Sequence, residues 1–90
     1  MAEIRVATIS NELGLHARAA AQFVQTANKF RAEVTVSKDG EEVNGKSILS
    51  LMMLAAPIGS EIVLKTDGDD ERELLDALIA LIENKFGEPK

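Results

Sequence analysis

The chain has 90 residues, a length that suits one domain, here residues 1–90, and is too short to enclose a deep substrate cavity. A net charge of −5 and an aromatic content of 3%, all of it Phe, disfavour nucleic acid as a partner. The chain has no cysteine and one His, so neither a disulfide nor a metal site is expected, and no cofactor is implied.

The first half of the chain predicts a strand and then a helix. Residues Met1 to Arg5 carry charges where a signal peptide would need an apolar run. Residues Glu3 to Ile9 are rich in β-branched side chains and alternate, with Ile4, Val6 and Thr8 on one side, which predicts a strand. A loop over 11–14 then leads to an Ala-rich helix that begins near His16. Its expected apolar face is Ala17, Ala20, Ala21, Val24 and Ala27, with Phe23 and Phe30 beside it.

A hairpin and a short helix are predicted next. Residues 32–36 alternate as a second strand, and Asp39-Gly40 predicts a tight turn into a short antiparallel strand around Val43. A helix over 47–56 should follow, capped by Ser47 and stopped by Pro57.

The last third of the chain predicts one more strand and one more helix. Residues 60–66 are expected to form the strand, and the acidic turn over 67–70 can cap a helix that runs to Gly87. The resulting order, βαββαβα, favours the α+β class, with a mostly antiparallel sheet covered by helices on one face. No apolar stretch approaches the roughly 20 residues of a membrane-spanning helix, so we expect a cytoplasmic protein without membrane insertion.

The single His is the first candidate functional residue. His16 lies where the first long helix begins, and a helix start offers free backbone N–H groups and a positive dipole end to a phosphoryl group. A neutral imidazole nitrogen can act as a nucleophile, and Arg18 could pair with phosphoryl oxygens. The alternative is a solvent-exposed His that merely begins a helix.

A second motif spans Gly40 to Ser47 and matches the nucleotide-binding pattern G-x-x-x-x-G-K-S. Its context does not fit, because Gly40 belongs to a predicted hairpin. Glu41 and Glu42 would also place two carboxylates beside the phosphates. A nucleotide-binding protein therefore stays an alternative that the context of the motif disfavours.

The helix that Ser47 begins has more apolar residues than so small a domain can bury. Leu51, Leu54 and Ala55 suffice for one buried face, so the remaining apolar side chains could form a partner-docking patch or could be fully buried. These surplus residues are Ile48, Leu49, Met52 and Met53. Ser47 itself could be a simple cap or a phosphorylation site, since a phosphate suits a helix start.

These residues together resemble a known family. The segment is Gly14-Leu15-His16-Ala17-Arg18-Ala19-Ala20, followed by Gln22-Phe23-Val24. It is similar to the active-site segment of HPr, the histidine-containing phosphocarrier of the bacterial phosphoenolpyruvate:sugar phosphotransferase system. The similarity extends over nearly the whole chain, including the element order, the segment over 44–47 and the acidic turn.

The resemblance implies an open-faced sandwich of four antiparallel strands under three helices, acting as a monomeric carrier and not as a stand-alone enzyme. It implies that His16 takes a phosphoryl group on Nδ1 from Enzyme I and passes it to Enzyme IIA components, with help from Arg18. Ser47 matches the serine that HPr kinase/phosphorylase modifies in many bacteria. The implied docking residues are Ala17, Ile48, Leu49, Met52 and Met53.

One residue departs from the family pattern. The family usually reads G-L-H-A-R-P-A, and this chain has Ala19 where Pro would stand. Ala19 keeps a backbone N–H that Pro lacks, which adds a donor to the first turn.

An alternative function of the same fold is a regulatory module in a nitrogen-related phosphotransferase branch.

Overall fold

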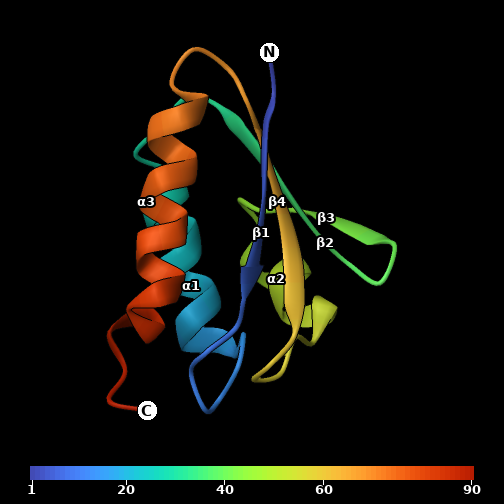
Figure 1. The fold of residues 1–90 in the computed structure, drawn as a ribbon, viewed down its shortest axis with the longest axis vertical. Helices are drawn as coiled ribbons and strands as arrows, with labels where there is room; N and C mark the ends of the chain where they lie inside the picture. Colours follow the sequence, from blue (N-terminus) through green and yellow to red (C-terminus); the bar gives the residue numbers. More distant parts are fainter.

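The computed structural model describes residues 1–90 as one four-stranded sheet with helices against one face (Figure 1). The strands are β1 (Glu3–Thr8), β2 (Glu33–Lys38), β3 (Glu41–Asn44) and β4 (Glu61–Asp67). The helices are α1 (Ala17–Ala27), α2 (Ile48–Leu54) and α3 (Glu71–Glu83), followed by the 3₁₀ turn η1 (Lys85–Gly87). The strand order is β1-β4-β2-β3 and every pair is antiparallel, so the predicted α+β open-faced sandwich is confirmed. None of the helices has the length and apolar character needed to cross a membrane.

The core lies between the sheet and the helices and contains 22 buried hydrophobic residues. The face that α1 buries differs from the one predicted, because Ala17 is exposed, Ala21 is only half-buried and Ala19 is fully buried. Alanines at most positions of the first turns leave the apolar stripe undefined, so packing against the sheet and α3 decides which of them face inward.

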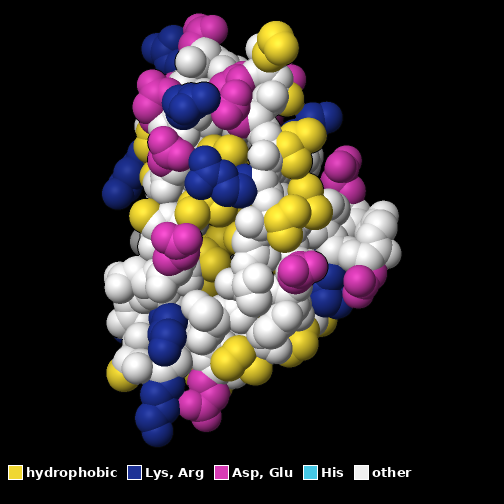
Figure 2. Space-filling model, viewed as in Figure 1, with side chains coloured by type: hydrophobic (Ala, Val, Ile, Leu, Met, Phe, Trp, Pro, Cys, Tyr) yellow, Lys and Arg dark blue, Asp and Glu magenta, His cyan; other side chains and the backbone are white.

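The sheet keeps its second face open. Ile4 and Val6 of β1 share one side of the strand, as predicted, and their side chains are exposed on that face. Ala7 and the following Ile9 are buried on the helix side. In Figure 2, hydrophobic side chains gather over β1 and β4, whereas charged side chains of both signs cover α3.

Two helices end earlier than predicted. α2 stops at Leu54 because Ala55 adopts a left-handed conformation (φ 53°), and Ala55 is exposed where a buried residue was expected. α3 ends at Glu83, and the remaining segment to Gly87 forms η1.

The acidic turn before α3 has a different task from the one predicted. Asp70 occupies the cap position, but its carboxylate makes no capping hydrogen bond. It accepts the backbone N–H groups of Arg31 and Ala32, at 2.9 and 2.8 Å. The turn therefore ties the segment just before β2 to the start of α3.

Candidate functional site

The loop that leads to His16 is held against the segment after α2. The Leu15 N–H donates to the Ala56 carbonyl at 2.9 Å. Gly14 has a φ of +69°, and a Cβ there would lie 2.6 Å from the same carbonyl oxygen. Only glycine fits this approach, and it places His16 at the junction of the loop, α1 and the end of α2.

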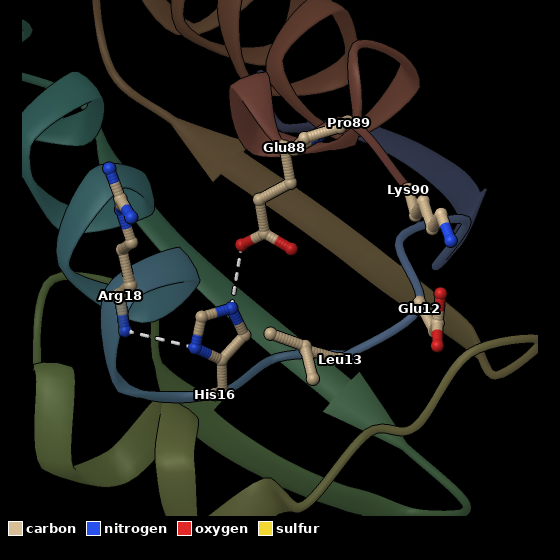
Figure 3. Close-up of a pocket in the computed structure, with 7 residues that line it drawn as sticks. All are labelled: Glu12, Leu13, His16, Arg18, Glu88, Pro89 and Lys90. Atoms are coloured by element: carbon tan, nitrogen blue, oxygen red, sulfur yellow. Dashed lines mark hydrogen bonds and ion pairs between the residues drawn. The ribbon is translucent and has the colours of Figure 1, made fainter.

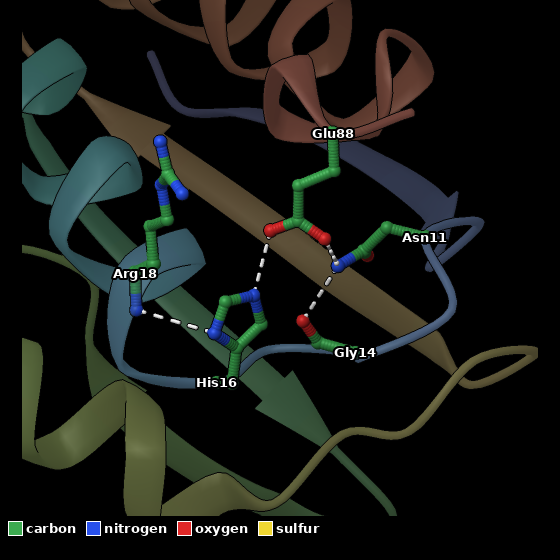
Figure 4. Close-up of polar contacts among 5 residues, drawn as sticks. All are labelled: Asn11, Gly14, His16, Arg18 and Glu88. Carbon is green, nitrogen blue, oxygen red and sulfur yellow. Dashed lines mark hydrogen bonds and ion pairs between the residues drawn. The ribbon is translucent and has the colours of Figure 1, made fainter. Parts of the chain in front are cut away.

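His16 is the residue that caps α1, and its two ring nitrogens have different partners (Figure 4). Nδ1 accepts the backbone N–H of Arg18 at 3.3 Å, and Nε2 lies 2.6 Å from Oε2 of Glu88. A nitrogen that accepts an N–H carries no proton, so this network assigns the proton to Nε2 and a lone pair to Nδ1.

Glu88 reaches His16 from the far end of the chain, 72 residues away. The amide Nδ2 of Asn11 donates to Oε1 of Glu88 at 3.0 Å and to the Gly14 carbonyl at 2.8 Å. The hydrogen bond from Asn11 is the largest cause that holds the pKa of Glu88 below its usual range, although burial opposes it. The hydrogen bond with His16 and the charges of His16 and Arg18 act in the same direction as Asn11.

Arg18 lies on the first turn of α1, beside the imidazole (Figure 3). Its backbone contacts His16, but its guanidinium forms no hydrogen bond or ion pair and is free to meet an incoming anion. His16 and Arg18 line an open hollow of about 400 Å³. The other lining residues are Glu12, Leu13, Glu88, Pro89 and Lys90.

His16 is partly enclosed and is not the solvent-exposed residue of the alternative reading. Its side chain is 28% exposed, because the Glu88 carboxylate covers the Nε2 edge of the ring. The backbone N–H groups of Ala17 and Ala19 have no hydrogen-bond partner. The donor that Ala19 adds in place of the family's Pro is therefore free at the amino end of α1.

The apolar patch on α2 is exposed, which rules out a fully buried helix. We use this name for Ile48, Leu49, Met52 and Met53, which are 42%, 67%, 41% and 68% exposed. Met52 lines a second hollow, of about 310 Å³, together with His16. The patch is thus continuous with the imidazole through the exposed residues Leu13 and Pro57.

Ser47 begins α2 at the edge of this patch. Its hydroxyl accepts the backbone N–H of Ser50 at 3.2 Å, as expected for a helix cap. The side chain is only half-buried.

The segment over 40–47 does not form a phosphate-binding loop. Gly40 follows Asp39 in a tight turn with φ values of 86° and 53°, and β3 then occupies the residues that would have to wrap around a phosphate. The prediction of an Asp-Gly hairpin is confirmed. The sequence matches the nucleotide-binding pattern, but the segment does not form the corresponding loop.

Sequence reasoning missed Asn11 and Glu88 as site residues. It also missed Leu13, the apolar residue of the loop before α1. Asn11 is completely buried, which is unusual for Asn and cannot be read from its place in a predicted loop. Nothing near Glu88 in the chain signals a role, because its partners are contributed by the opposite terminus.

An open-faced sandwich with a His at the start of its first helix is the arrangement expected of a small phosphocarrier domain. Residues 4–84 match the family model described as "PTS HPr component phosphorylation site". The chain belongs to the HPr family, the phosphocarrier proteins of the phosphotransferase system.

Named relatives agree with this assignment. The phosphocarrier protein HPr of Cupriavidus necator is 56% identical over 84 residues, which cover 93% of this chain and 94% of the relative. The crystal structure of HPr-C-His from Thermoanaerobacter tengcongensis has a TM-score of 0.94 and 48% identity, covering 98% of this chain and 99% of that one. A crystal structure of an HPr dimer from the same organism has a TM-score of 0.77 and 52% identity, covering 89% of this chain and 92% of that one. Since relatives also occur as dimers, the expectation of a monomer is not confirmed.

Proposed function

We propose that this protein accepts a phosphoryl group from Enzyme I on His16 and passes it to sugar-specific Enzyme IIA components in the cytoplasm. The observation that carries this proposal is that the two ring nitrogens of His16 have different partners. Nε2 faces a carboxylate, whereas Nδ1 keeps its lone pair at the amino end of α1. A single domain over residues 1–90 suffices for this task, since the partners contribute most of the positioning that phosphoryl transfer needs.

The transfer step uses Nδ1 as the nucleophile. As the Nδ1 lone pair forms a bond to phosphorus, the bond between phosphorus and the donor breaks, and the donor keeps that electron pair. The Arg18 N–H, no longer held by Nδ1, joins the free N–H groups of Ala17 and Ala19 as a donor for phosphoryl oxygens. The unpaired guanidinium of Arg18 adds positive charge on the same turn.

Docking involves the apolar patch together with Ala17. The hollow that Met52 of the patch shares with His16 supports docking of a partner beside the nucleophile. A partner that covers the patch therefore also covers the imidazole and excludes water from it. Flexible Met side chains suit a surface that must fit several partners in turn.

Ser47 is proposed as a regulatory site for an HPr kinase/phosphorylase. A phosphate on its half-buried hydroxyl would add about −1.5 to −2 charges beside the apolar patch, at a helix start that tolerates them. This charge would hinder docking without unfolding α2. Labelling by ATP and the kinase should reach the wild type and disappear in Ser47→Ala.

The central test is incubation with Enzyme I and phosphoenolpyruvate, followed by mapping of the modified residue. The wild type should gain one phosphate that is labile to acid and stable to alkali, and a sugar-specific Enzyme IIA should remove it. His16→Ala should gain none, while Ser47→Ala, a matched small substitution, should be labelled normally. Labelling of a folded His16→Ala variant would contradict the proposal. Transfer only to a nitrogen-branch acceptor would favour the regulatory alternative.

A further inference from the structure

We infer that Glu88 is a positioning residue for His16: its carboxylate holds the ring proton on Nε2, so that Nδ1 is the nucleophile, and it balances the ring charge that forms during transfer. The roles of Glu88 in making Nδ1 the nucleophile and in balancing the ring charge rest on the proposed function. The position of the ring proton concerns the unphosphorylated protein and does not.

The contact is built from both ends of the chain. Nε2 and Oε2 of Glu88 are 2.6 Å apart, which is short even for a hydrogen bond between a ring N–H and a carboxylate. Glu88 follows the buried Phe86, and two residues later the Lys90 carbonyl accepts the Glu12 N–H at 3.0 Å. The segment that bears Glu88 is therefore anchored on both sides of the carboxylate.

Asn11 fixes the other oxygen of the carboxylate. Both hydrogens of its buried Nδ2 are used, one by Glu88 and one by the Gly14 carbonyl, while its Oδ1 has no partner. The opposite amide orientation would place Oδ1 against a carbonyl and a carboxylate, which repel it. A buried amide that leaves its own oxygen unpaired in order to hold Glu88 indicates that the place of this carboxylate is strongly determined.

This arrangement selects one tautomer of His16. A carboxylate only accepts hydrogen bonds, so the proton of the neutral ring belongs on Nε2. The other tautomer would turn the Nε2 lone pair toward Glu88 and an Nδ1 proton toward the Arg18 N–H. Both contacts would then be repulsive.

Glu88 also matters in the transfer step itself. When the Nδ1 lone pair forms the bond to phosphorus and the donor leaves with its electron pair, the ring still carries its Nε2 proton and becomes cationic. The adjacent carboxylate stabilises this cation, and no proton has to move. In the reverse direction the electron pair returns to Nδ1, and the same tautomer is restored.

The test compares Glu88→Gln with Glu12→Gln. Both remove one carboxylate from the same hollow, but the exposed Glu12 side chain makes no hydrogen bond or ion pair. Long-range nitrogen–proton NMR of His16 should show mainly the Nε2-protonated tautomer in the wild type and Glu12→Gln, and a mixture of tautomers in Glu88→Gln. Transfer from Enzyme I should slow about tenfold in Glu88→Gln, in kcat more than in KM, and change less than about twofold in Glu12→Gln.

An unchanged tautomer in folded Glu88→Gln would overturn the positioning role, and equal transfer rates in the two variants would overturn the role in transfer. These failures differ from failure of the proposed function. If His16 were not the phosphoryl acceptor, His16→Ala would still be labelled, yet the NMR comparison would keep its meaning because it needs no phosphoryl donor.

Discussion

At the start of α1, one imidazole is held between a backbone N–H and a carboxylate, and a guanidinium with no partner lies two residues further along. The two groups that contact the His16 ring are thus engaged, whereas the groups that could meet a phosphoryl oxygen are free. We propose that the engaged groups prepare His16 as the nucleophile, whereas Arg18 stabilises the transferred group.

Arg18→Ala should slow phosphoryl transfer by about 10- to 100-fold and change the dissociation constant for Enzyme I less than about threefold, because the guanidinium acts where charge develops. Arg18→Lys should restore only part of the rate, since Lys is a point charge without a planar fork. Arg31→Ala removes an exposed guanidinium beyond the other end of α1 and is the matched control. An unchanged rate with a weaker complex would place Arg18 in docking alone. Stopped-flow transfer and calorimetric titration give the two quantities.

At the scale of the element, α2 has one buried and one exposed apolar face. Leu51 and Leu54 are 0% and 4% exposed, whereas Leu49 and Met53 are 67% and 68% exposed. An apolar face left in water at a helix of seven residues costs the protein solubility and adds nothing to its core. Such a face suits transient contact with partners.

Leu49→Glu should weaken Enzyme I binding by about tenfold or more and change the free energy of unfolding by less than about 0.5 kcal/mol. An acidic residue in the first turn of α2 also suits the helix dipole. Ile4→Glu is the control, because Ile4 is 63% exposed on the open face of the sheet, away from the patch. Met52→Glu should behave as Leu49→Glu does. Equal binding by Leu49→Glu and Ile4→Glu would remove the patch from the docking surface, and a large loss of thermal stability would show that Leu49 contributes to the core.

At the scale of the whole molecule, two carboxylates join segments that are far apart in the chain. Glu88 connects the C-terminal segment to the loop before α1, and Asp70 connects the start of α3 to β2. Two hydrogen bonds from backbone N–H groups, from Arg31 first and then Ala32, lower the pKa of Asp70, against a raising effect of burial. The charge of Lys46 lowers it further.

A carboxyl group with a lowered pKa in the folded protein stabilises that protein above its ordinary pKa, which is 3.8 for Asp70. The contribution is lost as the pH falls through the lower, folded-state value. Asp70→Asn should therefore unfold at a lower urea concentration than the wild type at pH 7, and the difference should shrink below about pH 4. Asp69→Asn, which removes an adjacent exposed carboxylate without hydrogen bonds, should follow the wild-type pH dependence. A constant difference between Asp70→Asn and the wild type at every pH would contradict this account.

Local patterns in the sequence determined the element order, the Asp39-Gly40 turn, the start of the first helix near His16, the cap Ser47 and the site motif. Each depends on residues within one turn or one strand of each other, so short-range physical rules suffice. The patterns were less reliable for which alanines of α1 face inward, where α2 and α3 end, and what Asp70 binds. These depend on the packing of one element against another.

The sequence by itself indicated His16 as the candidate nucleophile, because a His, an Arg and a helix start lie within three residues. Only the tertiary structure decided which groups contact each ring nitrogen of His16 and that His16 and Met52 line one hollow. The Nε2 partner, Glu88, lies 72 residues from His16, and the Asn11 that orients it belongs to the opposite end of the chain from Glu88. No local pattern encodes a contact between two termini, since it forms only when the loop before α1 and the segment after α3 pack side by side.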